Sequence, residues 1–232
     1  MKKLVTAACA LATGIALADG ATGIPSSNIV GFVSTNAQAN AFTATAVMFT
    51  DIGKSTLALT NITFEGIQRG DNIQIFDEYG DVTKTIEWVR QRVNGVNVYK
   101  WNDESYVFQL GDSFWLRPQG VVTTKFAGEV ELEDPLVISA AANVFTQMGN
   151  GTAAPVAITN ITFAGIQRGD NIQIFDAYGD VTKTIEWVRQ RVNGVNVYKW
   201  NDDSYVFQPG EAFWLRPQGA VTVTFPVPRV AD

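Results

Sequence analysis

An internal repeat constrains this chain more than any other feature. Residues 61–126 match residues 160–225 at an offset of 99 positions, and 57 of the 66 positions are identical. Inside this match, 35 consecutive residues differ at one position only, Glu78, which is Ala177 in the second copy. A period of about one hundred residues is long enough for a complete small domain. The repeat therefore predicts tandem duplication of a domain and not a solenoid of short units.

Upstream of position 61 the match weakens but continues. Residues 49–53 align with 145–149, after which the second copy carries three extra residues, and 31–33 stand opposite 128–130. This alignment predicts two units that follow each other without a linker. The expected organisation is a signal peptide at 1–18, an N-terminal tail at 19–27, β domain 1 at 28–126, β domain 2 at 127–225 and a C-terminal tail at 226–232.

Within a unit the composition favours strands. Thr, Val, Ile and aromatic residues dominate, and Gly, Asn and Asp interrupt them at short intervals. Asn94-Gly95 suits a type I′ turn, so 86–93 and 96–101 are expected to pair as a hairpin. No window has the period of an α-helix. The fold class expected is all-β, with two near-identical antiparallel β-sandwich or flattened-barrel domains of seven to nine strands each. Further strands are expected at 72–76, 82–89, 113–117 and 121–126.

The N-terminus has the pattern of a secretory signal peptide. Lys2 and Lys3 precede an uncharged apolar run, and Ala16-Leu17-Ala18 fits a small-x-small cleavage site. The run is too short for a membrane span. We therefore expect bacterial export to the cell surface or the extracellular space, as a protein that does not span a membrane. Lipidation at Cys9 is the alternative.

The residue inventory argues against most catalytic chemistry. The chain has no histidine, and its single cysteine lies in the expected signal peptide. Cys–His and Ser–His–Asp systems and ordinary zinc sites all need those side chains. Glu87 and Glu186 are the best candidates for a glycosidase carboxylate, but the spacing offers neither of them a partner. We expect no enzyme activity.

The charge pattern bears on partners and metals. Without Lys2 and Lys3 the 17 basic residues become 15 against 23 acidic ones, so the mature net charge is −8. We expect no nucleic-acid binding and no cofactor, with calcium as the one metal that the acidic turns could hold. The candidate calcium ligands are Asp77, Asp81, Asp103 and Glu104. Lys84 and Lys100 are candidates for lysine–asparagine isopeptide bonds, and Arg69-Gly70-Asp71 and Arg168-Gly169-Asp170 spell an integrin-binding tripeptide that we interpret as turn chemistry.

The tryptophans suggest two alternatives. Strand alternation places Trp88, Arg90 and Arg92 on one face, and Tyr99 on the same face as Trp101. Such a face could stack on the rings of a polysaccharide in a secreted lectin-like or adhesin module, or it could belong to the core with arginine stacked on indole. The candidate carbohydrate-binding residues are Trp88, Tyr99, Trp101, Trp187, Tyr198 and Trp200.

Several segments together resemble a family of uncharacterised secreted bacterial proteins built from repeated β domains. The segments are Ser27–Phe32, Gly70-Asp71-x-Ile73, the hairpins with their tryptophans, Gly111–Leu116 and Thr124–Val130. The resemblance implies export and a β fold, and it brings no catalytic residues with it.

The function that we expect is structural. Two domains joined without a linker would form a stiff rod whose units are related by translation, and repetition of that contact between chains would give a homo-oligomer or polymer such as a filament, sheath or surface layer. The tails could contribute by exchanging strands with a neighbouring copy. The candidate assembly residues are Asn28, Ile29, Val30, Phe32, Val33, Phe225, Val227 and Val230.

Overall fold

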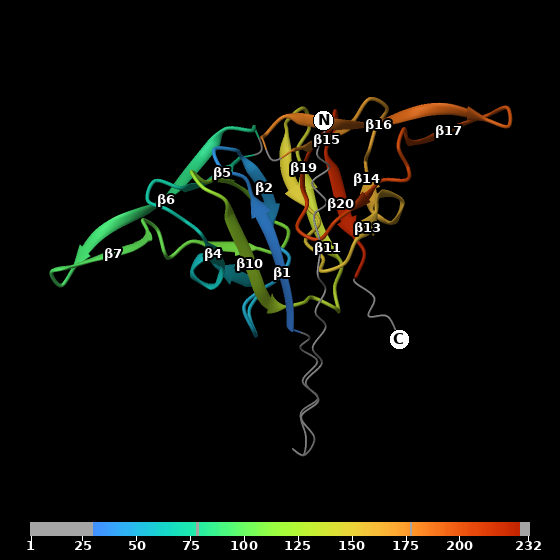
Figure 1. Ribbon diagram of the computed structural model, residues 1–232. Helices are drawn as coiled ribbons and strands as arrows, with labels where there is room; N and C mark the ends of the chain where they lie inside the picture. The colour runs from blue at the N-terminus through green and yellow to red at the C-terminus, as the bar shows by residue number, and fades with distance from the viewer. Residues whose placement is uncertain (1–29, 78, 177, 228–232) are drawn as a thin grey trace, which may run out of the picture.

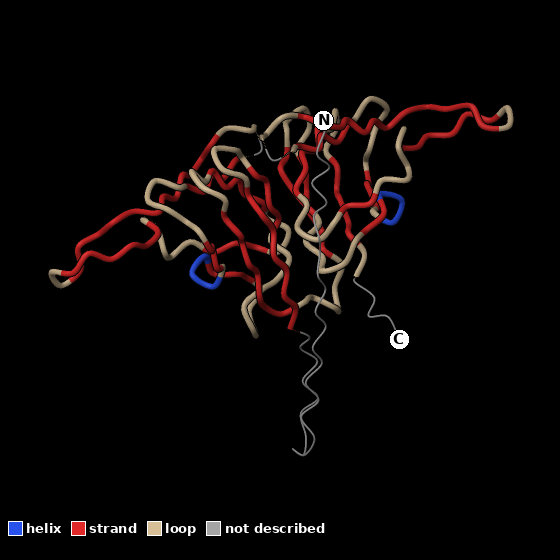
Figure 2. Tube along the Cα trace, in the orientation of Figure 1, coloured by secondary structure: helices blue, strands red, loops and turns tan. Residues whose placement is uncertain are grey.

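The structure is a computed structural model that describes residues 30–77, 79–176 and 178–227. Within these residues the chain is nearly all antiparallel β, as the sequence predicts (Figures 1 and 2). The first ten strands are β1 (Val30–Ala37), β2 (Thr43–Ala46), β3 (Thr56–Ala58), β4 (Thr63–Glu65), β5 (Asn72–Phe76), β6 (Val82–Val93), β7 (Val96–Trp101), β8 (Val107–Gln109), β9 (Ser113–Arg117) and β10 (Val122–Glu129).

The second ten strands repeat the first ten. They are β11 (Leu136–Ala140), β12 (Thr146–Gly149), β13 (Val156–Ala157), β14 (Thr162–Ala164), β15 (Asn171–Phe175), β16 (Val181–Val192), β17 (Val195–Trp200), β18 (Val206–Phe207), β19 (Ala212–Arg216) and β20 (Val221–Phe225). A 3₁₀ turn follows β3 at Leu59–Asn61 and β13 at Ile158–Asn160.

Each set of ten strands forms three sheets. In the first set the strand orders are β1-β10-β4, β2-β9-β5-β6-β7 and β3-β8. In the second set they are β11-β20-β14, β12-β19-β15-β16-β17 and β13-β18. The described chain therefore has ten strands per unit, more than the seven to nine expected, because the short pair β3-β8 and its copy are too brief to show as period-2 patterns.

The core of each unit lies between its three-stranded and five-stranded sheets, as in a β-sandwich. In the first unit, Val33 of β1 and Phe126 of β10 meet Ile73 of β5, Ile86 of β6 and Phe114 of β9 in one buried cluster. A separate cluster fills the second unit in the same way. Each unit therefore buries its own apolar face.

The hairpin at Asn94-Gly95 forms as predicted. Both residues have positive φ, 50° and 82°, which is the combination that a type I′ turn requires. The strand before the turn is a single twelve-residue element, β6, and not the two overlapping segments expected at 82–89 and 86–93. The strands expected at 72–76 and 113–117 have the predicted limits.

The expected boundary between residues 126 and 127 falls inside a strand. β10 continues to Glu129, and its last residues pair with the start of β1, with Gly31 opposite Gly128. The likeness between residues 31–33 and 128–130 therefore reflects two paired strands of the same unit and not two copies of one strand.

The register between the copies also differs from the sequence alignment. Thr43 pairs with Leu116, and Thr146 pairs with Leu215, so β12 is the copy of β2. Phe145 accordingly corresponds to Phe42 and not to Phe49. Between β2 and β3 the first unit is four residues longer than the second, because the offset between equivalent residues is 103 at β2 and 99 at β3. The sequence alignment placed extra residues in the wrong copy.

The two units are related by an approximate twofold rotation and not by the translation expected of a rod. Phe76 of the first unit packs on Trp214 of the second with ring centroids 5.8 Å apart, and Phe175 of the second packs on Trp115 of the first at 5.3 Å. Such reciprocal contacts characterise a twofold interface. Figure 1 shows the consequence: the hairpins β6–β7 and β16–β17 project from opposite ends of the molecule.

Candidate functional site

Of the predicted assembly residues, Val30, Phe32, Val33 and Phe225 lie in strands that pair within their own unit, and Val227 follows the last strand. All eight residues of β1 pair with β10, and Val33 is buried in the core while Phe32 is 45% exposed. Phe225 at the end of β20 is fully buried and pairs with Leu136 of β11, and Val227 is half-buried. Strand exchange through these tails would first have to break this pairing. Asn28, Ile29 and Val230 lie outside the described residues, as does the expected signal peptide.

The projecting hairpins are a different kind of element, and we call them the arms (Trp88–Trp101 and Trp187–Trp200). In the first arm the paired residues run from Trp88 opposite Trp101, through Arg90 opposite Tyr99, to Val93 opposite Val96. β7 is the last strand of its sheet, so its outer edge pairs with no described strand. The second arm has the same sequence and the same register.

The register determines which backbone groups lie on that open edge. In a two-residue hairpin the residues that flank the turn, here Val93 and Val96, exchange both hydrogen bonds, and the pairs then alternate. The backbone N–H and C=O groups of Asn97 and Tyr99 therefore point away from β6. The other edge of the hairpin, on β6, shows the same alternation. There the N–H of Trp88 points away from β7 and donates to the Asp71 carbonyl at 2.9 Å.

The arms expose apolar side chains as well as backbone groups. Val93 is 43% exposed, Val96 is 63% exposed and Tyr99 is 53% exposed, and the second arm has nearly the same values. An isolated two-stranded ribbon is only marginally stable in water, and a third strand or a covering element normally supports it. The arms thus combine an open edge with an uncovered apolar surface.

The predicted carbohydrate residues divide between the core and the surface. Trp101 is 4% exposed and packs edge-to-face on Trp88 at 5.3 Å and on Phe64 of β4 at 5.2 Å. Trp200 is buried in the same way in the second unit, on Trp187 and Phe163. Trp88 and Trp187 are half-buried, and only Tyr99 and Tyr198 of this set are exposed. A sugar platform built on Trp101 or Trp200 is therefore wrong for this structure.

A seam of aromatic rings joins the two units, and sequence reasoning missed it. With Gln74 and Gln173, the rings line an apolar groove of about 310 Å³ across the twofold. The turns of each unit close over the other, since a Cβ at Gly80 would lie 3.0 Å from Trp214 and one at Gly179 would lie 2.9 Å from Trp115. The repeat alone carries no signal of which surfaces face each other. The six rings are Phe42, Phe76, Trp115, Phe145, Phe175 and Trp214.

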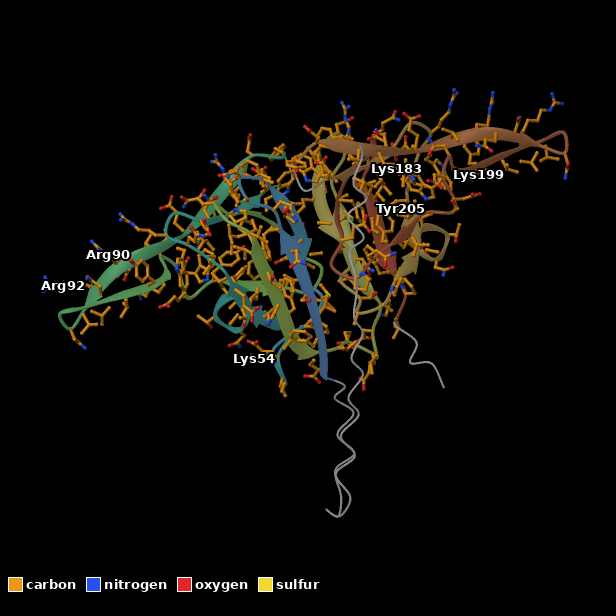
Figure 3. All side chains as sticks on the ribbon, in the orientation of Figure 1. Lys54, Arg90, Arg92, Lys183, Lys199 and Tyr205 are labelled. Carbon is orange, nitrogen blue, oxygen red and sulfur yellow. The ribbon has the colours of Figure 1, made fainter. Side chains whose placement is uncertain are left out.

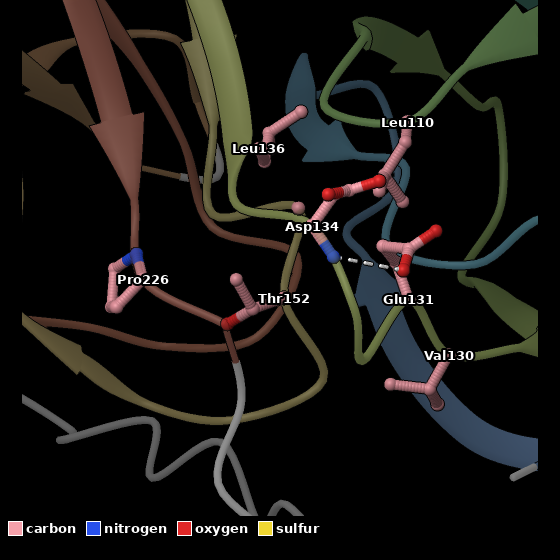
Figure 4. Close-up of a pocket in the computed structure, with 8 residues that line it drawn as sticks. Leu110, Val130, Glu131, Asp134, Leu136, Thr152 and Pro226 are labelled. Carbon is pink, nitrogen blue, oxygen red and sulfur yellow. Dashed lines mark hydrogen bonds between the residues drawn. The ribbon is translucent and has the colours of Figure 1, made fainter.

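A second, smaller cavity lies beside the segment between the units. Figure 4 shows Glu131 and Asp134 of this segment with Leu136 and Pro226 around it. Its volume is about 10 Å³, which is room for a single water molecule and not for a ligand. The Glu131 carboxylate accepts a hydrogen bond from the Asp134 N–H at 3.2 Å, so its role is to shape the turn.

Two carboxyl groups are perturbed by burial. Burial raises the pKa of Asp112 and of Glu211, which occupy equivalent positions in the two units. Glu211 is one methylene longer and accepts a hydrogen bond from the Tyr205 hydroxyl, whose pKa is raised by its own burial and then by the Glu211 charge. The carboxylates also accept backbone N–H groups at 2.7 and 2.8 Å, so they stabilise the turns before β9 and β19.

The carboxylates expected to bind calcium or to act in catalysis have local roles in the described chain. Asp77 accepts hydrogen bonds from the N–H groups of Tyr79 and Asp81 at 2.8 and 2.9 Å and so closes its own turn. Glu87 lies exposed on β6, and its N–H donates to the Asn102 side chain at 3.0 Å. In the part of the chain that the structure describes, no three acidic side chains come close enough together to hold a metal ion.

Two other candidate motifs have structural roles. Asp71 of the Arg-Gly-Asp tripeptide is fully buried and accepts the N–H groups of Gln68 and Gln119, each at 2.8 Å, so it ties two loops together. Lys84 lies in an exposed ion pair with Asp103 at 2.5 Å, whose hydrogen bond lowers the pKa of Asp103. An isopeptide bond needs a buried lysine, which Lys84 is not.

Comparisons with protein-family models, curated proteins and solved structures found no match. The resemblance to secreted repeat proteins therefore stays an expectation. Among residues 30–77, 79–176 and 178–227, no helix has the length and apolar character needed to cross a membrane.

Proposed function

We propose that the protein is a non-enzymatic exported protein that polymerises at or outside the cell surface, and that it does so by pairing the open edge of one arm with the open edge of an arm on another copy. The observation that carries this proposal is the pair of arms at opposite ends of the molecule (Figure 1). One such edge would give dimers, whereas two edges at opposite ends give a linear filament.

The composition of β7 suits edge-to-edge pairing. Its exposed edge carries valines, Asn97 and Tyr99, and its one charge, Lys100, is neutralised by Glu104 at 2.9 Å. Natural edge strands usually carry charges, prolines or bulges that prevent association, and none of these protects the five residues from Val96 to Lys100 beyond that one paired lysine. Antiparallel pairing of two such edges would give a four-stranded ribbon and support each hairpin.

The approximate twofold between the units explains why growth would use the arms and not the seam. An isologous interface pairs each unit's contact surface with the same surface of the other, so it closes on itself and does not repeat along a filament. In the seam, the ring centroids of Trp115 and Trp214 lie 6.5 Å apart. The arms are repeated elements that project from the molecule and combine an edge that pairs with no described strand with exposed apolar side chains.

The test is light scattering and electron microscopy of the mature chain as its concentration rises. We expect filaments from the wild type and monomers from the double variant Asn97→Pro/Asn196→Pro, because proline removes an N–H from the open edge and leaves the hairpin's own hydrogen bonds intact. The matched control, Asn97→Ala/Asn196→Ala, removes the same side chains but keeps the N–H groups, and it should assemble like the wild type.

A wild type that stays monomeric at high concentration would refute the proposal. So would a proline variant that still forms filaments, because that result would place the contact elsewhere on the molecule.

A further inference from the structure

We infer that one face of each arm binds anionic polysaccharide, a ligand class that goes beyond the proposed self-assembly. We call it the arginine–tyrosine face. In the first arm it consists of Arg90 and Arg92 of β6 with Tyr99 and Asn97 directly opposite them on β7. In the second arm the same face consists of Arg189, Arg191, Tyr198 and Asn196.

The arms concentrate positive charge on a negative molecule. Each fourteen-residue arm carries two arginines, one lysine and no acidic residue. The chain has a net charge of −6, and the two arms together carry +6, so the remainder carries −12. We call the rest of the molecule the body. This separation of charge gives the arms, and not the body, an attraction for anions.

The projection of the arms shields them from the acidic body. From Trp88 the strand advances about 7 Å to Arg90 and about 14 Å to Arg92, at about 3.4 Å per residue. Interactions between exposed charges fade over about 8 Å at physiological salt. An anionic chain at the tip of an arm is therefore beyond the main repulsion of the body.

The arginines of the arms are free to bind, in contrast to the lysines. Every described lysine lies in an ion pair with an acidic side chain, whereas no described arginine does. Arg90 and Arg92 are exposed, and Figure 3 shows both on the projecting part of the first arm. The Arg92 Nε donates to the Gly95 carbonyl at 3.2 Å, which orients the side chain and leaves its terminal nitrogens available.

The geometry of this face fits a charged sugar chain. Guanidinium groups bind carboxylate and sulfate through two parallel hydrogen bonds. The face of the Tyr99 ring is electron-rich, so it can pack against the C–H groups of a pyranose, and the Asn97 amide can bond a hydroxyl. Arg90 and Arg92 lie two residues apart, about 7 Å along the strand. An open ribbon with this arrangement suits an extended polymer better than a small ligand.

Nucleic acid is the competing polyanion, and the observations disfavour it. Single strands are held by stacking successive bases on several aromatic rings, whereas each arm exposes one such ring, Tyr99 or Tyr198. The two sites lie at opposite ends of the molecule, so one chain could link two polysaccharide strands.

The experiment measures binding of the mature chain to polygalacturonate, dextran sulfate, neutral dextran and single-stranded DNA by affinity electrophoresis at several salt concentrations. We expect retardation by the two anionic polysaccharides and none by neutral dextran. The comparison of uronate with sulfate shows which anion is preferred. Retardation should weaken at least tenfold in Arg90→Gln/Arg189→Gln and less than twofold in Arg69→Gln/Arg168→Gln, which removes the same charge from exposed positions outside the arms.

If retardation by the anionic polysaccharides weakens equally in both double variants, the inference is overturned, because net charge alone would then explain the binding. DNA binding as tight as polysaccharide binding, or no polyanion binding at low salt, would overturn it too. The arginine substitutions leave the backbone edge of β7 unchanged, so filament formation in these variants remains as in the wild type. Failure of one proposal is therefore distinguishable from failure of the other.

Discussion

Strands β1 and β7 look alike in sequence and differ in how far the rest of the molecule covers their side chains. Both are rich in valine and β-branched residues, and in the described chain both are edge strands that pair on one side only, β1 with β10 and β7 with β6. They differ in the burial of their side chains. Val33 of β1 is 5% exposed and Val96 of β7 is 63% exposed. The comparison teaches that strand composition indicates an apolar surface that needs covering, and that only the packing of the sheets shows whether another part of the chain covers it.

The sharpest contrast lies within one arm, between its root and its tip. Trp101 and Tyr99 share a face two residues apart, but Trp101 is 4% exposed and Tyr99 is 53% exposed. Trp101→Ala should lower the free energy of unfolding by about 3–5 kcal/mol. Tyr99→Ala should lower it by less than about 0.5 kcal/mol. Urea unfolding of both variants checks this, and a similar loss for the two would show that the arm packs on the body.

A smaller effect separates β1 from β7. Val33→Ala removes two buried methyl groups and should cost about 2 kcal/mol of stability without changing association. Val96→Ala should leave the free energy of unfolding almost unchanged and should weaken filament formation. Unfolding curves and light scattering on the same samples measure the stability and the association of both variants. Loss of filaments in a Val33→Ala variant that still folds would contradict this prediction.

The smallest effect is a pH dependence confined to the body. Because burial raises the pKa of Glu211 and Asp112, the folded state holds these protons after the unfolded state has released them. Their contribution to stability therefore falls as pH rises from their ordinary pKa values, 4.5 and 3.8, through the raised folded values. Glu211→Gln/Asp112→Asn should be more stable than the wild type at pH 7 and nearly equal to it at pH 4.

Filament formation should not follow that pH change, because Asp112 and Glu211 lie outside the arms and the arms contain no acidic residue. A stability gain of the same size at both pH values would show that the carboxyl groups are not the cause.

Local chemistry made some of this structure predictable. Asn94-Gly95 specifies its turn by backbone conformation alone, and strand alternation correctly places Arg90 and Arg92 on one face with Trp88. These inferences depend on neighbours in the sequence, so they need no knowledge of the tertiary structure.

The errors have a different origin, because each depends on contacts between distant residues. Whether Trp101 is exposed depends on Phe64 of β4, which covers it from another sheet. The likeness of Gly31 and Gly128 was mistaken for a repeat because paired strands of one sheet can share a sequence pattern. The aromatic seam required the symmetry between the units, which two near-identical sequences do not reveal.

The most direct test of the account is the molar mass of single-arm variants, measured by light scattering over a range of concentrations. If the two arms are the only growing ends, Asn97→Pro alone or Asn196→Pro alone should stop at dimers, while the wild type continues to filaments and the double proline variant stays monomeric. Long filaments from either single-arm variant would contradict the account, because a molecule with one working arm could not extend in two directions.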